Sequence, residues 1–153
     1  MRIVFLHPDL GLGGAERLIV DAAIAMKRKV LFFASIRFET IENDDFFKFW
    51  QGHDVTIYTS HYDASHCFRE TENLDIVVRG DFMPRSIFGR GHIVFASLRS
   101  AYLSLFAALK SGADVFHTDQ ISLYNLCLAV LRPTTPIVFY CHFPDKLLAS
   151  RSS

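Results

Sequence analysis

Near the N terminus, a short apolar run passes through a glycine-rich turn into an amphipathic pattern. Residues 3–6 read IVFL, and the following turn contains Gly11, Gly13 and Gly14. From residue 15 onward, apolar side chains recur at helical spacing: Leu18, Ile19, Ala22, Ala23 and Met26. A buried strand that leads through glycines into a helix is the opening unit of a parallel α/β sheet.

The rest of the chain repeats this alternation of strands and helices. We predict strands at residues 54–59, 74–78, 114–117 and 137–141, and helices at residues 93–109 and 122–131. Pro84, Gly89 and Gly91 predict a loop over residues 82–91. Short connections between alternating elements indicate a Rossmann-like α/β fold, with a parallel sheet covered on both faces. At 153 residues, the chain has room for one such domain.

Residues 30–51 interrupt this pattern. They are rich in phenylalanine and show neither a clear period nor turn chemistry. Joining Lys29 directly to Gly52 creates an ordinary helix–glycine–strand connection. We therefore interpret residues 30–51 as an insertion between the helix and the strand, of the kind that a retained intron in the gene model would produce. The alternative is a strand at residues 30–35 followed by an excursion of the chain.

Composition excludes several classes of protein. Sixteen basic residues balance sixteen acidic ones, so no global charge attracts nucleic acid. Three cysteines without a CxxC pair argue against a disulfide framework and fit a reducing compartment such as the cytosol. The apolar start is too short for a signal-peptide core, and no uninterrupted apolar run reaches the roughly 18 residues of a membrane span.

The glycine-rich turn is the first candidate site. Its backbone N–H groups and the helix N terminus favour a diphosphate, which makes Gly13 and Gly14 candidate binding residues. The alternative is a turn that only connects two elements. Glu16 stands where a dinucleotide fold has its third glycine, and the second predicted strand ends at Thr59-Ser60 without a ribose-binding acid, so we exclude an NAD-dependent dehydrogenase.

Polar residues at the ends of the last two strands form the second candidate. His142 and Asp145 follow residues 137–141, and His117 and Asp119 end the strand before it. Ligands of open parallel sheets bind outside these carboxyl ends, where such groups hydrogen-bond sugar hydroxyls. The alternatives are a histidine bonded to the backbone at residue 142 and a helix cap at Asp119.

Two further segments have a structural and a functional interpretation. Residues 61–67 mix His, Asp and Cys, but they match no zinc spacing and favour a polar loop. The helix at residues 93–109 is apolar almost all round, so it is either a core helix or one that lies at a membrane surface. Nearby basic residues would then contact anionic headgroups or a lipid diphosphate: Arg79, Arg85, Arg90 and Arg99.

Taken in order, several blocks resemble one family. They are FLHPDLGLGGAER at residues 5–17, TSHYD at 59–63, HCF at 66–68, GD at 80–81, PR at 84–85 and FYCHFPDKLL at 139–148. They resemble the alpha-1,3/1,6-mannosyltransferases of dolichol-linked oligosaccharide synthesis, which are retaining GT-B enzymes of the GT4 type. The resemblance spans nearly the whole chain apart from residues 30–51.

This resemblance implies the N-terminal, acceptor-side domain of a GT-B enzyme that lacks its C-terminal donor domain. The implied reaction transfers mannose from GDP-mannose to dolichyl-diphosphate-linked Man-GlcNAc2, without a metal or other cofactor, at the cytosolic face of the endoplasmic reticulum membrane. Complexes with other glycosyltransferases of the pathway are implied as well. Gly13 and Gly14 match the loop near the donor diphosphate, Glu16 the acid after it, and His142 the histidine that contacts the donor sugar. One alternative is a truncated, non-catalytic chain that keeps the fold. Another is a different GT4 transferase, which the FYCHFPD block disfavours.

Overall fold

The computed structural model describes residues 1–27, 52–84 and 91–141. Within these ranges, five strands form one sheet: β1 (Arg2–His7), β2 (Asp54–Thr59), β3 (Asp75–Val78), β4 (Val115–Asp119) and β5 (Ile137–Tyr140). The order is β3-β2-β1-β4-β5, and every pairing is parallel. The predicted Rossmann-like α/β sheet is thus confirmed, with strand bounds that differ from prediction by at most two residues.

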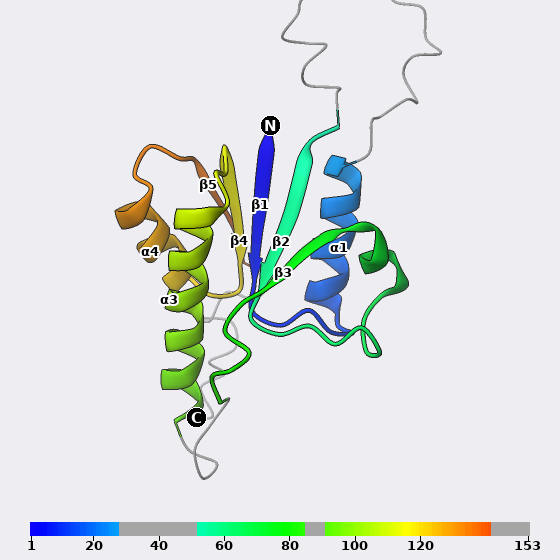
Figure 1. Ribbon diagram of the computed structural model, residues 1–153, viewed down its shortest axis with the longest axis horizontal. Coiled ribbons are helices and arrows are strands. Elements are labelled where there is room, and N and C mark those ends of the chain that lie inside the picture. The colour runs from blue at the N-terminus through cyan, green and yellow to red at the C-terminus, as the bar shows by residue number, and fades with distance from the viewer. Residues whose placement is uncertain (28–51, 85–90, 142–153) are drawn as a thin grey trace, which may run out of the picture.

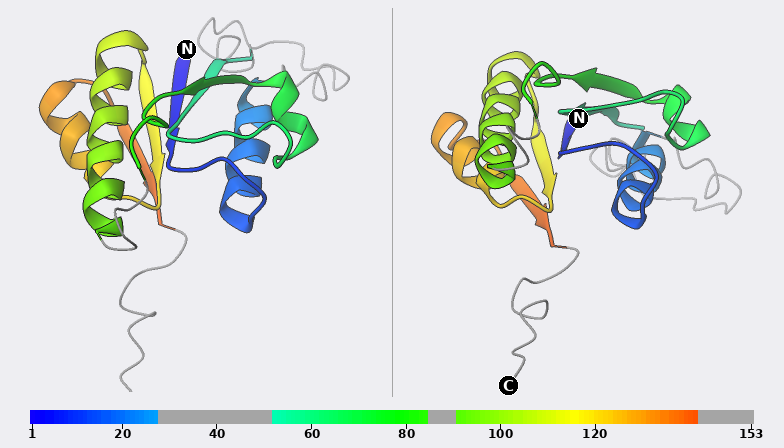
Figure 2. Two further views of the ribbon diagram at one scale, coloured as in Figure 1. Left: turned by 60° about the horizontal axis from the view of Figure 1, so that its bottom comes forward. Right: turned by 90° about the horizontal axis from the view of Figure 1, so that it is seen from below.

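Helices cover both faces of this sheet (Figures 1 and 2). α1 (Gly14–Lys27) lies on one face, whereas α3 (His92–Lys110) and α4 (Leu123–Leu131) lie together on the other. A short 3-10 helix, η2 (Arg69–Asn73), precedes β3 and was not predicted. The three α-helices agree with the sequence pattern to within about one residue at each end that was predicted.

The central strand β1 supplies side chains to two separate cores. Ile3 and Phe5 pack with α1, whereas Val4 and Leu6 pack with α3 and α4. This alternation follows from the two-residue repeat of a strand. Burying each large apolar side chain contributes about 1.5–3 kcal/mol, so a continuous apolar run suits a strand that is covered on both faces. His7 ends this run and is fully buried as well.

At the amino ends of the strands, Arg2 binds three neighbouring segments. Its Nε donates to Asp54 at 3.2 Å, its Nη1 to the Ser111 carbonyl at 3.0 Å, and its backbone N–H to Asp114 at 2.7 Å. Gly112 follows α3 with φ of +59°, and a Cβ there would lie 2.8 Å from Arg2 Nη1. These contacts fix the edge of the sheet opposite to the one where the strands end.

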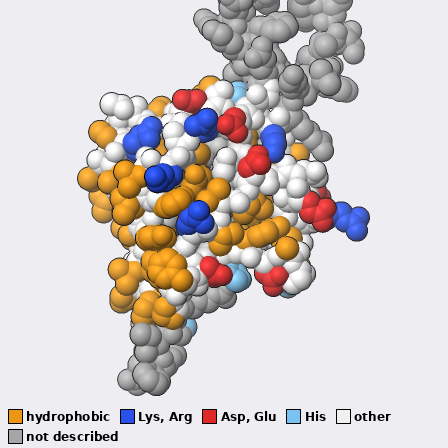
Figure 3. All heavy atoms as spheres, in the orientation of Figure 1, with side chains coloured by type: hydrophobic (Ala, Val, Ile, Leu, Met, Phe, Trp, Pro, Cys, Tyr) orange, Lys and Arg blue, Asp and Glu red, His pale blue; other side chains and the backbone are white. Residues whose placement is uncertain are grey.

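The long helix α3 buries mostly small side chains and exposes several large ones. Its buried positions are Ser100, Leu103, Ser104, Ala107 and Ala108. Val94, Leu98, Leu105 and Leu109 are exposed and fall on one stripe at helical spacing. Hydrophobic side chains gather over this part of the surface, with basic side chains beside them (Figure 3). The helix is therefore partly a core helix and partly an apolar surface.

By length and composition alone, α3 is sufficient to cross a membrane, with 19 residues and a mean hydropathy of 1.4. The sequence criterion of an uninterrupted apolar run did not select it, because Arg99 and several serines interrupt the helix. Its inner face packs on the sheet and on α4. In this domain, α3 covers one face of the sheet together with α4.

The predicted insertion at residues 30–51 lies outside the described residues, but both of its flanks are described. α1 ends at Lys27, and the His53 backbone N–H donates to the Met26 carbonyl at 3.0 Å. The chain therefore leaves α1 and enters β2 at adjacent points, and a short connection would join them.

Deletion of residues 30–51 is expected to keep the sheet and raise the free energy of unfolding by roughly 1–2 kcal/mol, because a shorter connection costs less chain entropy to close. Thermal and urea unfolding measure this change. A control that replaces residues 30–51 by a Gly/Ser stretch of equal length should stay close to the parent chain. Loss of cooperative unfolding in the deletion variant would refute the insertion hypothesis.

Candidate functional site

The candidate site lies where the strand order reverses. β1 is paired with β2 on one side and with β4 on the other, and β1 leads into α1 on one face of the sheet whereas β4 leads into α4 on the other. Ligands of open α/β sheets bind at such a point, outside the carboxyl ends of the strands. His7 and Asp119 are the last residues of β1 and β4.

His7 and Asp119 form a buried polar pair at this edge. The ring Nδ1 lies 2.9 Å and 2.8 Å from the two carboxylate oxygens, and both side chains are 0% exposed. A carboxylate accepts hydrogen bonds, so Nδ1 carries the proton and the orientation of the ring is fixed. Breaking this pair would leave a polar group in the interior without its partner.

The other ring nitrogen of His7 faces Glu16 in the first turn of α1. The distance from Nε2 to Oε1 is 3.7 Å, which makes an ion pair when the ring is protonated but is too long for a hydrogen bond. Within the described part of the chain, Nε2 is buried without a hydrogen-bond partner. The Glu16 side chain is 21% exposed, so it reaches from this buried ring to the surface.

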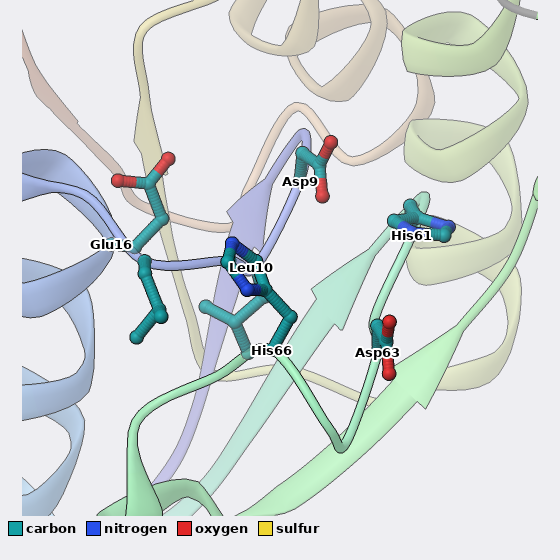
Figure 4. A pocket seen from close by; sticks show the side chains of 8 residues that line it. Asp9, Leu10, Glu16, His61, Asp63 and His66 are labelled. Atoms are coloured by element: carbon teal, nitrogen blue, oxygen red, sulfur yellow. The ribbon is translucent and has the colours of Figure 1, made fainter.

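Glu16 lines a cavity of about 340 Å³ at the carboxyl edge of the sheet. Its walls come from the loop after β1, the loop after β2 and the start of α1 (Figure 4). The lining residues are Asp9, Leu10, Gly11, Leu12, Glu16, His61, Asp63 and His66. Three carboxylates and two imidazoles therefore surround one opening, a set that hydrogen-bonds hydroxyl groups well.

Backbone contacts hold the two loops of the pocket together. The Leu10 N–H donates to the His61 carbonyl at 3.1 Å, and Leu10 pairs with Tyr62 in an isolated parallel bridge. The Ser60 N–H donates to the Pro8 carbonyl at 3.3 Å. The pairing of β1 with β2 thus continues beyond both strands and sets the separation of the two walls.

Local hydrogen bonds set the charge of Asp63. The Ser65 hydroxyl and the Ser65 backbone N–H donate to its carboxylate at 2.7 Å and 2.8 Å. Both bonds lower the pKa of the Asp63 carboxyl group below its usual value, and the bond from the Ser65 hydroxyl has the larger effect. The carboxylate therefore stays ionised to lower pH than a free aspartate does, and its oxygens are available as hydrogen-bond acceptors.

A second set of polar contacts supports the pocket from behind. His61 Nδ1 lies 2.8 Å from an Asp81 carboxylate oxygen, which links the loops after β2 and β3. Arg99, whose side chain is 11% exposed, donates from Nη2 to the Ser60 carbonyl at 3.2 Å. Arg99 therefore supports the loop after β2 and does not face a membrane surface, contrary to the sequence interpretation.

The structure brings some of the predicted residues together and separates others. Glu16 lines the pocket, and Gly13 lies against the Glu16 side chain. Gly14 is exposed, and a Cβ added there would meet nothing within 4 Å. Asp119 is buried behind the pocket. Arg79 lies apart, with its guanidinium 4.6 Å from the centre of the Phe106 ring on α3. His142, Asp145, Arg85 and Arg90 fall outside the described residues.

Sequence reasoning missed His7, although a usable signal exists. The register pairs Phe5 with His117 and Leu6 with Thr118, so the next positions along are His7 and Asp119. A histidine at the end of a buried strand, one register step from an aspartate, predicts a polar pair. Recognising it requires knowing that β1 pairs with β4, which the order of elements in the sequence does not give.

The mixed segment at residues 61–67 behaves as a polar loop within the described ranges. Cys67 Sγ lies 3.3 Å from Thr71 Oγ1 and 3.5 Å from the Tyr62 hydroxyl, and Asp63 binds Ser65. Among the residues that the structure describes, no three side chains of His, Cys, Asp or Glu group as metal ligands would.

Known proteins similar to this chain are glycosyltransferases. A family model described as Glycosyltransferase Family 4 matches residues 51–152. The alpha-1,3/1,6-mannosyltransferase ALG2 of Rhizomucor pusillus is 43% identical over 100% of the chain, and those of Saccharomyces cerevisiae and Mus musculus are 41% and 39% identical over 98% and 99%. The chain spans only 30%, 26% and 32% of the length of these three relatives.

Asp119→Ala is expected to lower the free energy of unfolding by about 3 kcal/mol, because it leaves the buried His7 ring without its acceptor. Urea unfolding measures the loss. Asp63→Ala is the control at the pocket rim, with an expected loss under about 1 kcal/mol. If both variants lower the free energy of unfolding by the same small amount, the His7–Asp119 pair does not stabilise the edge of the sheet.

Proposed function

The chain belongs to glycosyltransferase family 4, and from that membership we propose that it forms the acceptor-side part of a retaining mannosyltransferase. The proposed reaction transfers mannose from GDP-mannose to dolichyl-diphosphate-linked Man-GlcNAc2, through one alpha-1,3 and one alpha-1,6 bond. The observation that carries this proposal is the identity of 39–43% to enzymes named alpha-1,3/1,6-mannosyltransferases, which extends along 98–100% of the chain.

The pocket suits the sugar of the acceptor better than a phosphate. Asp9, Glu16 and Asp63 present carboxylates to the same opening, and these repel an anion but accept hydrogen bonds from hydroxyl groups. His61 and His66 add nitrogens that bond hydroxyls in either direction. In our proposal, these side chains orient the acceptor saccharide so that one hydroxyl is held in place for attack. Orientation of this kind supplies a large part of catalysis.

The exposed start of α1 offers a separate place for the donor diphosphate. Gly14 is the first residue of α1 and borders open space, so a ligand can approach its backbone closely. The N terminus of a helix of 14 residues also attracts negative charge. We assign the diphosphate to this position and the acceptor sugar to the pocket beside it. The donor is a substrate, and our proposal includes no metal or other cofactor.

His142 completes the proposal from beyond the described residues. It lies two positions after β5, whose carboxyl end is on the same edge of the sheet as the pocket. We propose that His142 contacts the donor sugar and acts mainly in the transition state, while Asp145 binds hydroxyls nearby.

The apolar stripe of α3 gives the domain a surface for a membrane. We propose that Val94, Leu98, Leu105 and Leu109 enter the interface of the cytosolic leaflet of the endoplasmic reticulum, where the lipid-linked acceptor resides. Arg79 lies exposed at the end of β3 and over Phe106, and it is available to anionic headgroups together with Arg85 and Arg90.

A chimera tests the proposed activity. Placing this chain in the Saccharomyces cerevisiae relative, instead of the matching stretch, is expected to give mannose transfer from GDP-mannose to a Man-GlcNAc2 diphosphate lipid. The 153-residue chain alone is expected to give none, because a two-domain cleft is needed to hold both substrates. Radiolabelled mannose in the extracted lipid is the readout.

His142→Ala in the same chimera is the matched control, with kcat expected to fall roughly a hundredfold and the melting temperature nearly unchanged. An inactive wild-type chimera that is folded and produced normally would favour a non-catalytic chain. Transfer by the isolated chain would contradict the division of the site between two domains.

Vesicle binding tests the apolar stripe. Leu98→Asp together with Leu105→Asp should weaken binding of the chain to vesicles that contain phosphatidylserine by about tenfold, because two apolar contacts with the interface are lost. Leu18→Asp is the control, since Leu18 is an exposed leucine of α1 on the opposite face of the sheet. Equal loss with both variants, or none with either, would exclude α3 as the membrane surface.

A further inference from the structure

We infer that His7, held by Asp119, is a positioning residue for Glu16 and thereby fixes the Glu16 carboxylate in the pocket. The inference rests on the proposed function, since it assigns to Glu16 the role of binding a hydroxyl group of the saccharide. His7 itself does not line the pocket, and its side chain is 0% exposed. Any effect of His7 on the reaction is therefore indirect, and Glu16 is the pocket residue that its Nε2 faces.

The first step is the fixed orientation of the ring. Both oxygens of Asp119 lie within 2.9 Å of Nδ1, so the Nδ1 proton is directed at the carboxylate and the ring plane cannot rotate without losing that bond. Phe5 on the same strand stacks on His117 with ring centres 4.6 Å apart, which packs the interior between β1 and β4 just behind the pair. The direction of Nε2 is consequently set by the sheet.

The second step is what Nε2 meets. With Nδ1–H directed at Asp119, Nε2 is the ring atom that faces Glu16. A hydrogen bond between these two side chains requires one proton, either on the ring or on the carboxylate. Because Nε2 is buried and has no hydrogen-bond partner among the described residues, a shift of Glu16 toward the ring would satisfy it.

The third step is the space that Gly13 provides. A Cβ at Gly13 would collide with Glu16 Oε2 and lie 3.0 Å from Glu16 Cδ. The carboxylate thus folds back over Gly13, against the first turn of α1, where the helix N terminus favours a negative charge. His7 on one side and Gly13 on the other leave Glu16 a narrow range of positions at the pocket wall.

The competing interpretation is that Glu16 only caps α1. A glutamate at the third helical position often returns to the backbone at the start of its helix and stabilises it by a fraction of a kcal/mol up to about 1 kcal/mol. Such a cap requires no histidine and no Asp119. The two interpretations therefore differ in whether His7 and Glu16 are coupled, and coupling can be measured.

Nitrogen NMR of the histidine rings in the 153-residue chain measures this coupling without any activity. Glu16→Gln is expected to move the His7 Nε2 resonance while Nδ1 stays that of a protonated nitrogen bound to Asp119. Asp63→Asn is the matched control, because Asp63 lines the same pocket but belongs to a different wall. An unmoved Nε2 resonance in Glu16→Gln, or an equal shift in Asp63→Asn, would overturn the inference.

Kinetics in the chimera measure the same coupling in the reaction. His7→Asn keeps a hydrogen-bond donor for Asp119 but removes the Nε2 atom that faces Glu16. We expect this variant to lower kcat about tenfold with little change in KM. Glu16→Gln should lower kcat at least as much, and the double variant no further. If the two losses in kcat multiply in the double variant, His7 and Glu16 act independently. That result would overturn the positioning role while leaving the mannosyltransferase proposal intact.

An inactive wild-type chimera would instead count against the proposed function, and the NMR comparison would still decide whether His7 and Glu16 are coupled. The Glu16→Gln and Asp63→Asn variants both change pocket side chains that are at least partly exposed, so neither depends on the folding of a variant at the buried His7.

Discussion

The buried contact between His7 and Asp119 joins β1 and β4, the two strands between which the strand order reverses. Removing either side chain would leave the other buried without this contact, at a cost in stability. The pairing of β1 with β4 brings them together, and in return the pair fixes the ends of both strands. The loop that follows β1 and the helix that follows β4 start from this fixed point. The pocket and the position of Glu16 both depend on it.

The two edges of the sheet have different tasks. At the amino edge, Arg2 is satisfied by Asp54, Asp114 and the Ser111 carbonyl, and these contacts join segments without presenting a ligand site on the pocket side. At the carboxyl edge, Glu16, Asp63 and His66 face an opening. Contacts such as Arg99 with Ser60 and His61 with Asp81 support this edge from behind. The amino edge thus carries structural ion pairs, whereas the carboxyl edge carries both structural polar contacts and the charged side chains that line the pocket.

Sequence periodicity was sufficient for the fold because each strand and helix has a clear apolar pattern. It was insufficient for features that depend on which surfaces meet. Both sides of α3 are apolar, so the pattern could not tell that Leu103 and Ala107 are buried while Leu98 and Leu105 are exposed. Arg99 looked like a surface residue because its acceptor, the Ser60 carbonyl, is 39 positions away. His7 was missed for the same reason, since Asp119 is 112 positions away. Glu16 was predicted as a site residue because it belongs to a local turn, and the structure places it in the pocket wall.

We propose that the pocket at the carboxyl edge of the sheet binds the saccharide of the acceptor. Amide chemical-shift mapping of the chain during titration with the soluble trisaccharide Man-GlcNAc2 tests it most directly. We expect saturable shifts at pocket residues: Leu12, Glu16, His61 and His66. We expect no shifts at the opposite edge of the sheet, at Arg2, Asp54 and Asp114. Shifts confined to the opposite edge, or no saturable shift around the pocket, would contradict it.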